Sequence, residues 1–260
     1  MIDKETLLRI SKLTGLKPFQ QEKNYLQTML LRSLYSNISR ELVFKGGTAL
    51  AFFYGLNRFS EDLDFTLEGS LELENLLEEV KKDFEVLGIK ANFKILDNDQ
   101  RSFSFRIGAE GPFFTKEIER CYVRVEISKR EKVLRKVDAK ELRPIYSDIL
   151  PFFVILMDLE EILAEKVRAI IWRGKARDLY DLWFLIKMNV KIDIPLIDKK
   201  LIYYRKRFDI EKFVEKVKSL NTVWEQELRP VVVGNLPNFE VVERDVAHKF
   251  YSQTTNMQNR

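Results

Sequence analysis

The chain has 260 residues, with 44 Lys and Arg against 40 Asp and Glu, and it contains one cysteine and one histidine. The single cysteine, Cys121, excludes an internal disulfide and a multi-cysteine zinc cluster, and the single histidine, His248, excludes histidine-rich metal motifs. Catalysis by a Ser–His or Cys–His pair is therefore disfavoured, and any chemistry is expected to depend on carboxylates, Lys, Arg and hydroxyl groups.

The net charge of +4 permits contact with nucleotides or nucleic acid without requiring it. The longest uncharged apolar run, residues 149–157, is far shorter than the roughly 20 residues of a membrane-spanning helix. The N-terminal sequence shows no signal-peptide pattern. We therefore expect a cytoplasmic protein with no membrane partner.

Taken in chain order, the predicted elements are helices, then a mixed α/β region, then helices. Residues 1–40 are expected to form helices that break at Gly15 and restart at Pro18. Ser70 is expected to cap a helix over 71–86, and Asp158 to begin the helical half with a capping box that ends at Glu161. A further helix is expected over 48–54, and strands over 42–44, 62–67, 91–96, 102–107, 121–128, 142–146 and 152–156.

This order predicts an α+β fold in three parts. Residues 1–40 form N-terminal helices that pack on the core, residues 41–157 form a central domain with a mixed sheet, and residues 158–260 form a helical domain. The boundary near 157 is placed where the strand signals stop.

The first candidate site is the segment Gly46-Gly47-Thr48, between a predicted strand and a predicted helix. Paired glycines let the backbone turn tightly and approach a ligand, and the N-terminus of the following helix favours phosphate oxygens. Thr48 adds a hydroxyl group. The segment is not a Walker A loop, and a Gly-Gly pair that only makes a turn is the alternative interpretation.

The second candidate is the pair Asp62 and Asp64, which the alternation of the 62–67 strand places on one face. Two carboxylates in this arrangement repel each other unless a cation lies between them. Oxygen ligands of this kind suit Mg²⁺, which binds carboxylates together with substrate phosphates and water. A solvated strand end is the alternative, but the short distance in sequence to Gly46 and Gly47 favours a site where metal and phosphate lie side by side.

A third carboxylate, Glu126, lies on the polar face of the 121–128 strand. If that strand neighbours the strand of Asp62 and Asp64, Glu126 completes a metal-binding triad for two Mg²⁺ ions. An ordinary salt bridge between Glu126 and Arg124 is the alternative.

The helical half contains a lysine, Lys166, on the apolar face of the helix that follows Asp158. A buried ammonium needs an anion, which we expect to be a triphosphate or, alternatively, a carboxylate of the first half. Asp178 and Asp181 follow one helical turn apart in the next segment.

Two of these stretches carry a resemblance to a known family. The sequences Lys45-Gly-Gly-Thr-Ala-Leu50 and Arg58-Phe-Ser60-Glu-Asp-Leu-Asp-Phe65 resemble the nucleotidyltransferase toxins of type IV toxin–antitoxin and abortive-infection systems, the AbiEii/AbiGii family. The later stretches 163–169 and 177–182 are similar to the C-terminal motifs of that family. The resemblance extends from about residue 40 to residue 190.

The resemblance implies a DNA polymerase β-like nucleotidyltransferase domain, followed by a helical domain. It implies Mg²⁺-dependent transfer of a nucleoside monophosphate from an NTP to an RNA 3′ hydroxyl, with tRNA as the expected acceptor, and a cognate antitoxin protein as partner. Carried over by position, it assigns phosphate and nucleotide binding to Gly46, Gly47, Thr48, Arg58 and Ser60, metal binding to Asp62 and Asp64, neutralisation of the triphosphate to Lys166, and an acidic role to Asp178 or Asp181.

Other functions remain open at this point. A nucleotidyl- or phosphotransferase that acts on a protein or a small molecule would use the same residues, and a catalytically silent module that binds RNA or a nucleotide would retain the fold. The run Tyr203-Tyr204-Arg205-Lys206-Arg207 could contact RNA through stacking and charge; packed aromatics beside a solvated basic run are the alternative.

Overall fold

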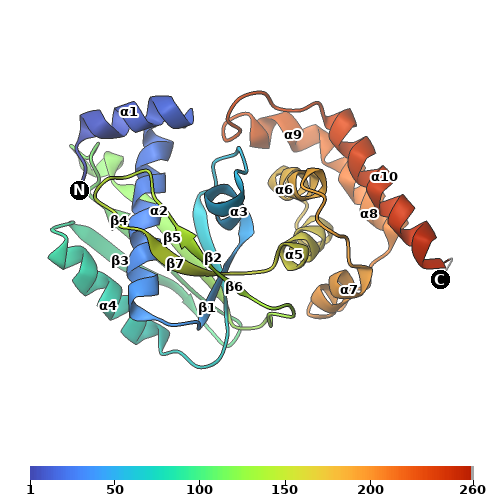
Figure 1. Ribbon diagram of the computed structural model, residues 1–260, viewed down its shortest axis with the longest axis horizontal. Helices are drawn as coiled ribbons and strands as arrows, with labels where there is room; N and C mark the ends of the chain where they lie inside the picture. Colours follow the sequence, from blue (N-terminus) through green and yellow to red (C-terminus); the bar gives the residue numbers. More distant parts are fainter. Residues whose placement is uncertain (259–260) are drawn as a thin grey trace. The chain divides into compact units, whose positions relative to one another are not determined.

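The structure is a computed structural model that describes the backbone of residues 1–258 and the side chains of residues 1–253. The chain divides into two compact units (Figure 1). Unit 1 comprises residues 1–55, 59–133 and 137–156, and unit 2 comprises residues 56–58, 134–136 and 157–260. The sequence predicts domain boundaries at residues 40 and 157. The division into two compact units does not test whether these parts are separate domains, so the boundaries stay predictions.

Unit 1 begins with two helices, as the sequence predicts. Helix α1 (Lys4–Thr14) ends at Gly15, whose positive φ of 75° closes the helix, and α2 (Pro18–Asn37) restarts with proline in its first turn. The remaining helices of the unit are α3 (Gly46–Tyr54) and α4 (Leu73–Val86), with a short 3₁₀ turn over Glu117–Glu119.

A seven-stranded mixed sheet forms the centre of unit 1, with the strand order β3-β4-β5-β2-β1-β7-β6. Strand β2 pairs with β1 in antiparallel and with β5 in parallel orientation, so β2 lies inside the sheet. The strands are β1 (Leu42–Lys45), β2 (Asp62–Leu67), β3 (Ala91–Asn98), β4 (Ser102–Ala109), β5 (Cys121–Ser128), β6 (Asp138–Leu142) and β7 (Phe152–Leu156).

Helices α2 and α4 cover the apolar face of this sheet (Figure 1). Leu30 of α2 and Phe84 of α4 enclose one small interior space together with Ile107 and Val123 of the strands. The alternation in β2 places Leu63 and Phe65 in this core. Asp62 and Asp64, which alternate with these two residues, therefore lie on the opposite face.

Most predicted strands are confirmed, including 62–67, 121–128 and 152–156, but two details were wrong. The strand expected over 142–146 instead covers Asp138–Leu142, because Pro144 has no backbone N–H to donate to a ladder. Helix α4 begins at Leu73 with Glu72 as its N-cap rather than Ser70, since Leu71 packs against the core ahead of the helix.

Unit 2 is helical. Its helices are α5 (Leu159–Trp172), α6 (Ala176–Lys187), α7 (Ile194–Ile202), α8 (Ile210–Ser219), α9 (Asn221–Leu228) and α10 (Phe239–Gln258). Asp158 caps α5 by accepting hydrogen bonds from the backbone N–H groups of Glu160 and Glu161, which confirms the predicted start of the helix. The carboxylate of Glu161, which a capping box would turn back to Asp158, accepts from the backbone N–H groups of Leu134 and Arg135. Among the described residues, no helix combines the length and the apolar character that crossing a membrane requires.

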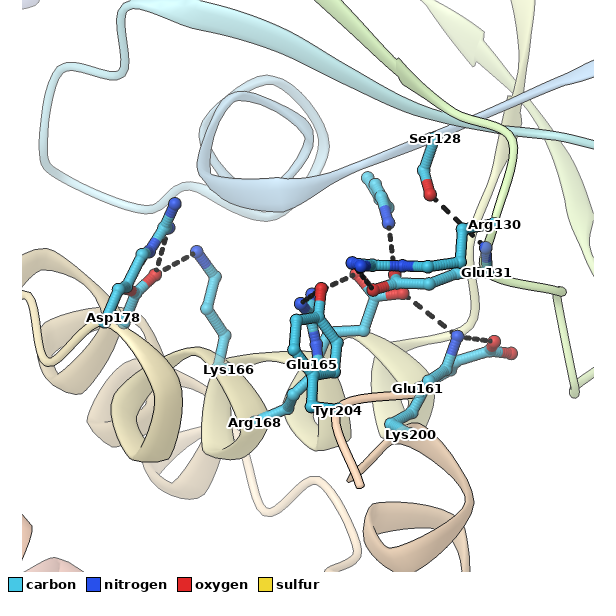
Figure 2. Close-up of polar contacts among 12 residues, drawn as sticks. Ser128, Arg130, Glu131, Glu161, Glu165, Lys166, Arg168, Asp178, Lys200 and Tyr204 are labelled. Atoms are coloured by element: carbon cyan, nitrogen blue, oxygen red, sulfur yellow. Dashed lines mark hydrogen bonds and ion pairs between the residues drawn. The ribbon is translucent and has the colours of Figure 1, made fainter. Parts of the chain in front are cut away.

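A buried lysine joins the helices of unit 2. The Nζ atom of Lys200 on α7 lies 2.6 Å from a carboxylate oxygen of Glu161 and 3.0 Å from one of Glu165, both on α5 (Figure 2). Glu161 also accepts hydrogen bonds from the backbone N–H groups of Leu134 and Arg135, so it attaches the 134–136 segment to the helices. Burial opposes the charge of Lys200, yet the two glutamates hold its pKa above the ordinary value.

We expect Lys200→Met to destabilise unit 2 by about 3–5 kcal/mol, because it leaves two buried carboxylates without their shared cation. All three tryptophans lie in unit 2, so urea unfolding followed by tryptophan fluorescence reports on this unit. The matched control is Lys199→Met, at the exposed neighbouring position of the same helix, which should shift the midpoint little. Equal midpoints for the two variants would contradict the role of Lys200.

Candidate active site

The two aspartates of β2 share the polar face of the sheet with residues of both neighbouring strands. In the β-ladder, Asp64 lies opposite Lys45 of β1 and opposite Glu126 of β5, and Asp62 lies opposite Arg124. Directly opposite residues point to the same face. The condition that the sequence set for Glu126, a β5 strand adjacent to β2, is therefore confirmed.

Gly46, the first residue of α3, lies against Asp64. It has a φ of 78°, and a Cβ atom built on it would lie 2.5 Å from the Oδ2 atom of Asp64. Only glycine fits, because a side chain would both strain this backbone conformation and occupy the place of the carboxylate. The glycine pair thus belongs to the first turn of α3 and brings the start of that helix to Asp64.

Thr48 ties α3 to β2. Its buried hydroxyl group donates a 2.5 Å hydrogen bond to the backbone carbonyl oxygen of Asp62. The N-cap residue Lys45 makes no side-chain hydrogen bond to the first turn of α3. The N-terminus of α3, with its positive dipole end, is therefore fixed beside the two aspartates.

The electrostatic surroundings of Asp62 disfavour a negative charge. Burial raises the pKa of Asp62, and the neighbouring carboxylate of Asp64 raises it further, against the opposing effect of Lys23. A cation placed near both carboxylates would relieve this repulsion between like charges. The two residues directly before β2 are held by side chains of α2: Gln27 donates a hydrogen bond to the carbonyl oxygen of Ser60, and Lys23 pairs with Glu61 at 3.1 Å.

Glu126 forms the salt bridge that was its alternative interpretation. Its carboxylate lies 3.0 Å from the guanidinium of Arg124, and both side chains are about half exposed. Within the described residues, no group of three His, Cys, Asp or Glu side chains is arranged to hold a metal ion. Although Glu126 faces Asp64, a preformed carboxylate triad is not present.

The pair Asp62 and Asp64 nevertheless fits a hard divalent cation. Both are oxygen donors on one strand face, they repel each other in its absence, and Gly46 leaves room for the Asp64 carboxylate. Mg²⁺ commonly binds to one or two protein carboxylates and takes its other oxygens from phosphates and water. These two residues are the ones that could hold it.

Lys45 and Glu131 are residues of this region to which the sequence analysis gave no role. The Nζ atom of Lys45 lies 3.3 Å from Glu131, and both side chains are buried. Lys45 could have been recognised from the sequence, because it directly precedes Gly46 at the end of a buried strand. Nothing in the sequence marks Glu131, because it follows β5 in a charged stretch of the kind that usually forms a solvent-exposed loop.

Unit 2 holds the second group of predicted residues. The ammonium of Lys166 lies 3.2 Å from Asp178 and 2.7 Å from Asp181, and all three side chains are buried (Figure 2 shows Lys166 pointing toward Asp178). The anion partners of Lys166 are thus carboxylates of its own half of the chain. Both aspartates pair with the same lysine, so these contacts do not distinguish which of the two is the acidic site residue that the family resemblance implies.

Two arginines complete this cluster. Arg58 is buried and forms two hydrogen bonds of 2.6 Å with the carboxylate of Asp181, and Arg173 binds both oxygens of Asp178 at 2.8 and 2.9 Å. Burial alone would oppose ionisation, but Lys166 and Arg173 hold the pKa of Asp178 below its ordinary value of 3.8. Against the same burial, Arg58 and Lys166 lower the pKa of Asp181.

The structure therefore gathers the candidate residues into one set within each unit. In unit 1, Gly46, Thr48, Asp62, Asp64 and Glu126 lie on or beside the polar face of β2. In unit 2, Arg58, Lys166, Asp178 and Asp181 form one ion-paired cluster.

We predict that the stability of unit 2 depends on acid through this cluster. Since the folded pKa values of Asp178 and Asp181 lie below the ordinary value of 3.8, their stabilisation is complete only above about pH 5, where both groups are ionised in the unfolded chain as well, and it is lost progressively as the pH falls. Urea midpoints from tryptophan fluorescence should fall between pH 5 and pH 3.

The matched variant is Asp181→Asn, which removes one titrating group and leaves Arg58 without its carboxylate. Its midpoint should be lower at pH 7 and should decrease less toward pH 3 than that of the wild type. An identical decrease in both proteins would show that the cluster does not set the pH dependence.

Comparison with known proteins agrees with this arrangement. The sequence profile of the nucleotidyl transferase AbiEii toxin family, of type IV toxin–antitoxin systems, matches residues 30–246, a range that contains every candidate site residue. No curated protein matches the chain in sequence.

Several solved structures are similar to the chain, among them the following three. MenT4, a nucleotidyltransferase toxin from Mycobacterium tuberculosis, has a TM-score of 0.65 at 21% identity and covers 96% of this chain and 89% of its own. A putative nucleotidyltransferase from Helicobacter pylori has a TM-score of 0.57 at 22% identity, with 91% and 97% covered. JHP933 from Helicobacter pylori has a TM-score of 0.55 at 21% identity, with 92% and 96% covered.

At this identity the structural matches establish the fold, which is the α+β, DNA polymerase β-like nucleotidyltransferase fold that the sequence predicts. The family match spans most of the chain and supplies the activity. The chain belongs to the nucleotidyl transferase AbiEii toxin family of type IV toxin–antitoxin systems, and it is a nucleotidyltransferase.

Proposed function

We propose that this nucleotidyltransferase toxin uses Mg²⁺ to move a nucleoside monophosphate from an NTP to the 3′ hydroxyl of an RNA, with tRNA as the expected acceptor. It would act in the cytoplasm, and a cognate antitoxin protein would restrain it. The observation that carries this proposal is the geometry at Gly46, where the start of α3 meets the carboxylate of Asp64 on β2.

Each residue at this point has a distinct task in the proposal. The backbone N–H groups at the start of α3 favour phosphate oxygens, and Gly46 and Gly47 keep side chains out of their way. Asp62 and Asp64 would hold Mg²⁺, which when bound supplies positive charge to the phosphates. Thr48 acts by fixing the helix to β2 through its bond to the carbonyl of Asp62.

The reaction is a displacement at phosphorus. The 3′ oxygen of the acceptor forms a bond to the α phosphorus while the bond from that phosphorus to the bridging oxygen of the β phosphate breaks. Pyrophosphate leaves, and the hydroxyl proton is released to solvent. In phosphoryl transfer of this kind the protein contributes positioning and charge neutralisation.

Lys166 remains the residue proposed to neutralise the triphosphate. Its two carboxylate partners fix the ammonium in place, which reduces the side-chain freedom lost when an anion binds. Within the same proposal, Arg58 supports this group through Asp181, and Ser60 contributes to nucleotide binding next to β2.

The central test is incubation of the protein with Mg²⁺, each of the four α-labelled NTPs and total tRNA. We expect label in the RNA for the wild type, and a loss of transfer of at least a thousandfold for Asp64→Ala, because a ligand of the metal is lost. Asp64→Ala should retain the wild-type unfolding midpoint of unit 2, measured by tryptophan fluorescence.

Mass measurement of both RNA and protein separates the alternatives. A label found on protein or on a small molecule instead of RNA would replace the proposed acceptor. Incorporation by Asp64→Ala at the wild-type rate would refute the role of this carboxylate.

Gly46→Ala should reduce transfer at least a hundredfold, because the new Cβ atom would displace the carboxylate of Asp64. The matched control is Gly55→Ala at the other end of α3. Gly55 has nearly the same φ, 77°, but no atom lies within 4 Å of its added Cβ. Both variants should lose about 1–2 kcal/mol of stability from backbone strain, whereas only Gly46→Ala should lose activity; comparable activities would contradict the assignment.

A further inference from the structure

Unit 2 carries a basic groove that none of the candidate site residues uses. It is open to solvent, has a volume of about 550 Å³, and lies between the C-terminal end of α5, the 203–208 segment and α8. Four of the residues that line it are cations: Lys206, Arg207, Lys212 and Lys216.

These charges are largely uncompensated. Asp209, the acidic residue of the groove, pairs with Lys212 at 3.5 Å and caps α8 by accepting a hydrogen bond from the backbone N–H of Lys212. Within the side chains described, up to residue 253, Arg207 and Lys216 take part in no ion pair. The groove therefore has a net positive charge, which suits a chain of phosphates.

An exposed aromatic ring lies beside the groove. Trp172, at the end of α5, is 56% exposed, and its ring centroid lies 4.9 Å from that of Tyr204. The ammonium of Lys206 lies 5.3 Å from the centre of the Trp172 ring. Arg168 is positioned in turn over Tyr204, at 4.8 Å, and donates a hydrogen bond to its hydroxyl group. The two aromatic rings thus lie next to each other, with a cation against each of them.

Packed aromatic rings form the floor of the groove. Phe208 packs against Phe213 and Phe250 with ring centroids 5.6 and 5.9 Å apart, and Phe213 is fully buried. The backbone N–H of Phe208 also donates to the carboxylate of Asp198 on α7. The cations are therefore presented from an ordered base, which lowers the entropy cost of binding.

We infer that this groove, with Trp172 beside it, binds a single-stranded RNA segment of the acceptor. The cations would contact successive phosphates, and an unpaired base would stack on Trp172. Stacking of this kind needs an unpaired base, since bases of a duplex present no free ring face. This inference rests on the proposed function in one respect, namely that the acceptor is RNA.

An acidic protein would satisfy the charge of the groove but gives no role to the exposed indole. A single strand of RNA uses both features, because each nucleotide brings one phosphate and one planar base. The combination of charge and aromatic surface therefore favours RNA.

The test measures binding of the full-length protein to a labelled single-stranded RNA of about 12 nucleotides by fluorescence anisotropy. The variant Lys206→Ala/Lys216→Ala should bind about tenfold more weakly near 0.1 M salt, and its log–log salt slope should be smaller by about 1.4, since two phosphate contacts are lost. The matched control, Lys199→Ala/Lys218→Ala, removes two exposed lysines of α7 and α8 that do not line the groove, and it should bind as the wild type does.

A second set of variants tests the stacking role of Trp172. Trp172→Ala should weaken RNA binding by roughly five- to 150-fold, the effect of losing one stacked base, whereas Trp172→Phe should retain most of the affinity. Polyglutamate serves as an acidic-polypeptide probe. If the lysine variant loses polyglutamate and RNA equally and Trp172→Ala changes neither, the surface is a general anion-binding one and the inference is overturned.

Failure of this inference can be distinguished from failure of the proposed function. Transfer to tRNA by the groove variants with an unchanged KM for tRNA and unchanged RNA affinity would overturn the groove assignment alone. If the protein labels only protein or a small molecule but its RNA binding depends on the groove, the groove binds RNA, and both the proposed acceptor and the role of the bound RNA as acceptor are refuted. We expect the groove variants to show a raised KM for tRNA and an unchanged KM for the NTP.

Discussion

The close approach of Gly46 to Asp64 is the constraint on which the site in unit 1 depends. The chain leaves β1, turns at once into α3, and returns as β2 beside the strand it left, so the first turn of the helix lies against a carboxylate of the returning strand. A Cβ atom at residue 46 would end this arrangement. Thr48 then fixes the helix from the other side by its bond to the carbonyl of Asp62. The helix end proposed to bind phosphate and the two carboxylates proposed to bind Mg²⁺ are thereby brought side by side.

Buried ion pairs connect the helices of unit 2, in addition to the apolar contacts of its core. Lys200 joins α7 to α5 through Glu161 and Glu165, and Lys166 joins α5 to α6 through two aspartates. Buried ion pairs contribute little net stability because desolvation opposes them, but breaking one is costly. A packing of the helices that separates these partners is therefore penalised. The buried charges also attach two short segments to these helices. Arg58 of the 56–58 segment pairs with Asp181, and Glu161 accepts hydrogen bonds from backbone N–H groups of the 134–136 segment.

Several elements followed from local sequence signals. The alternation of Asp62, Leu63, Asp64 and Phe65 predicted both the strand and its polar face, and Asp158 predicted the start of α5. One error occurred where a distant contact decided the outcome, because Leu71 joined the core instead of α4. The other had a local cause, since Pro144 excludes the strand expected after residue 142 and the strand lies before it. Glu131 gave no signal, since its partner Lys45 lies 86 residues away.

By itself, the sequence determined the α+β class, the family, and the residue types of the site, because periodicity, glycine placement and motif order are local properties. Only the tertiary structure decided what each charge contacts. It placed Glu126 opposite Asp64 and yet paired it with Arg124, and it gave Lys166 two aspartates of its own helical half. The physical reason is that a charged side chain pairs with whichever opposite charge the fold brings within about 3 Å, and sequence spacing does not encode distances between separate elements.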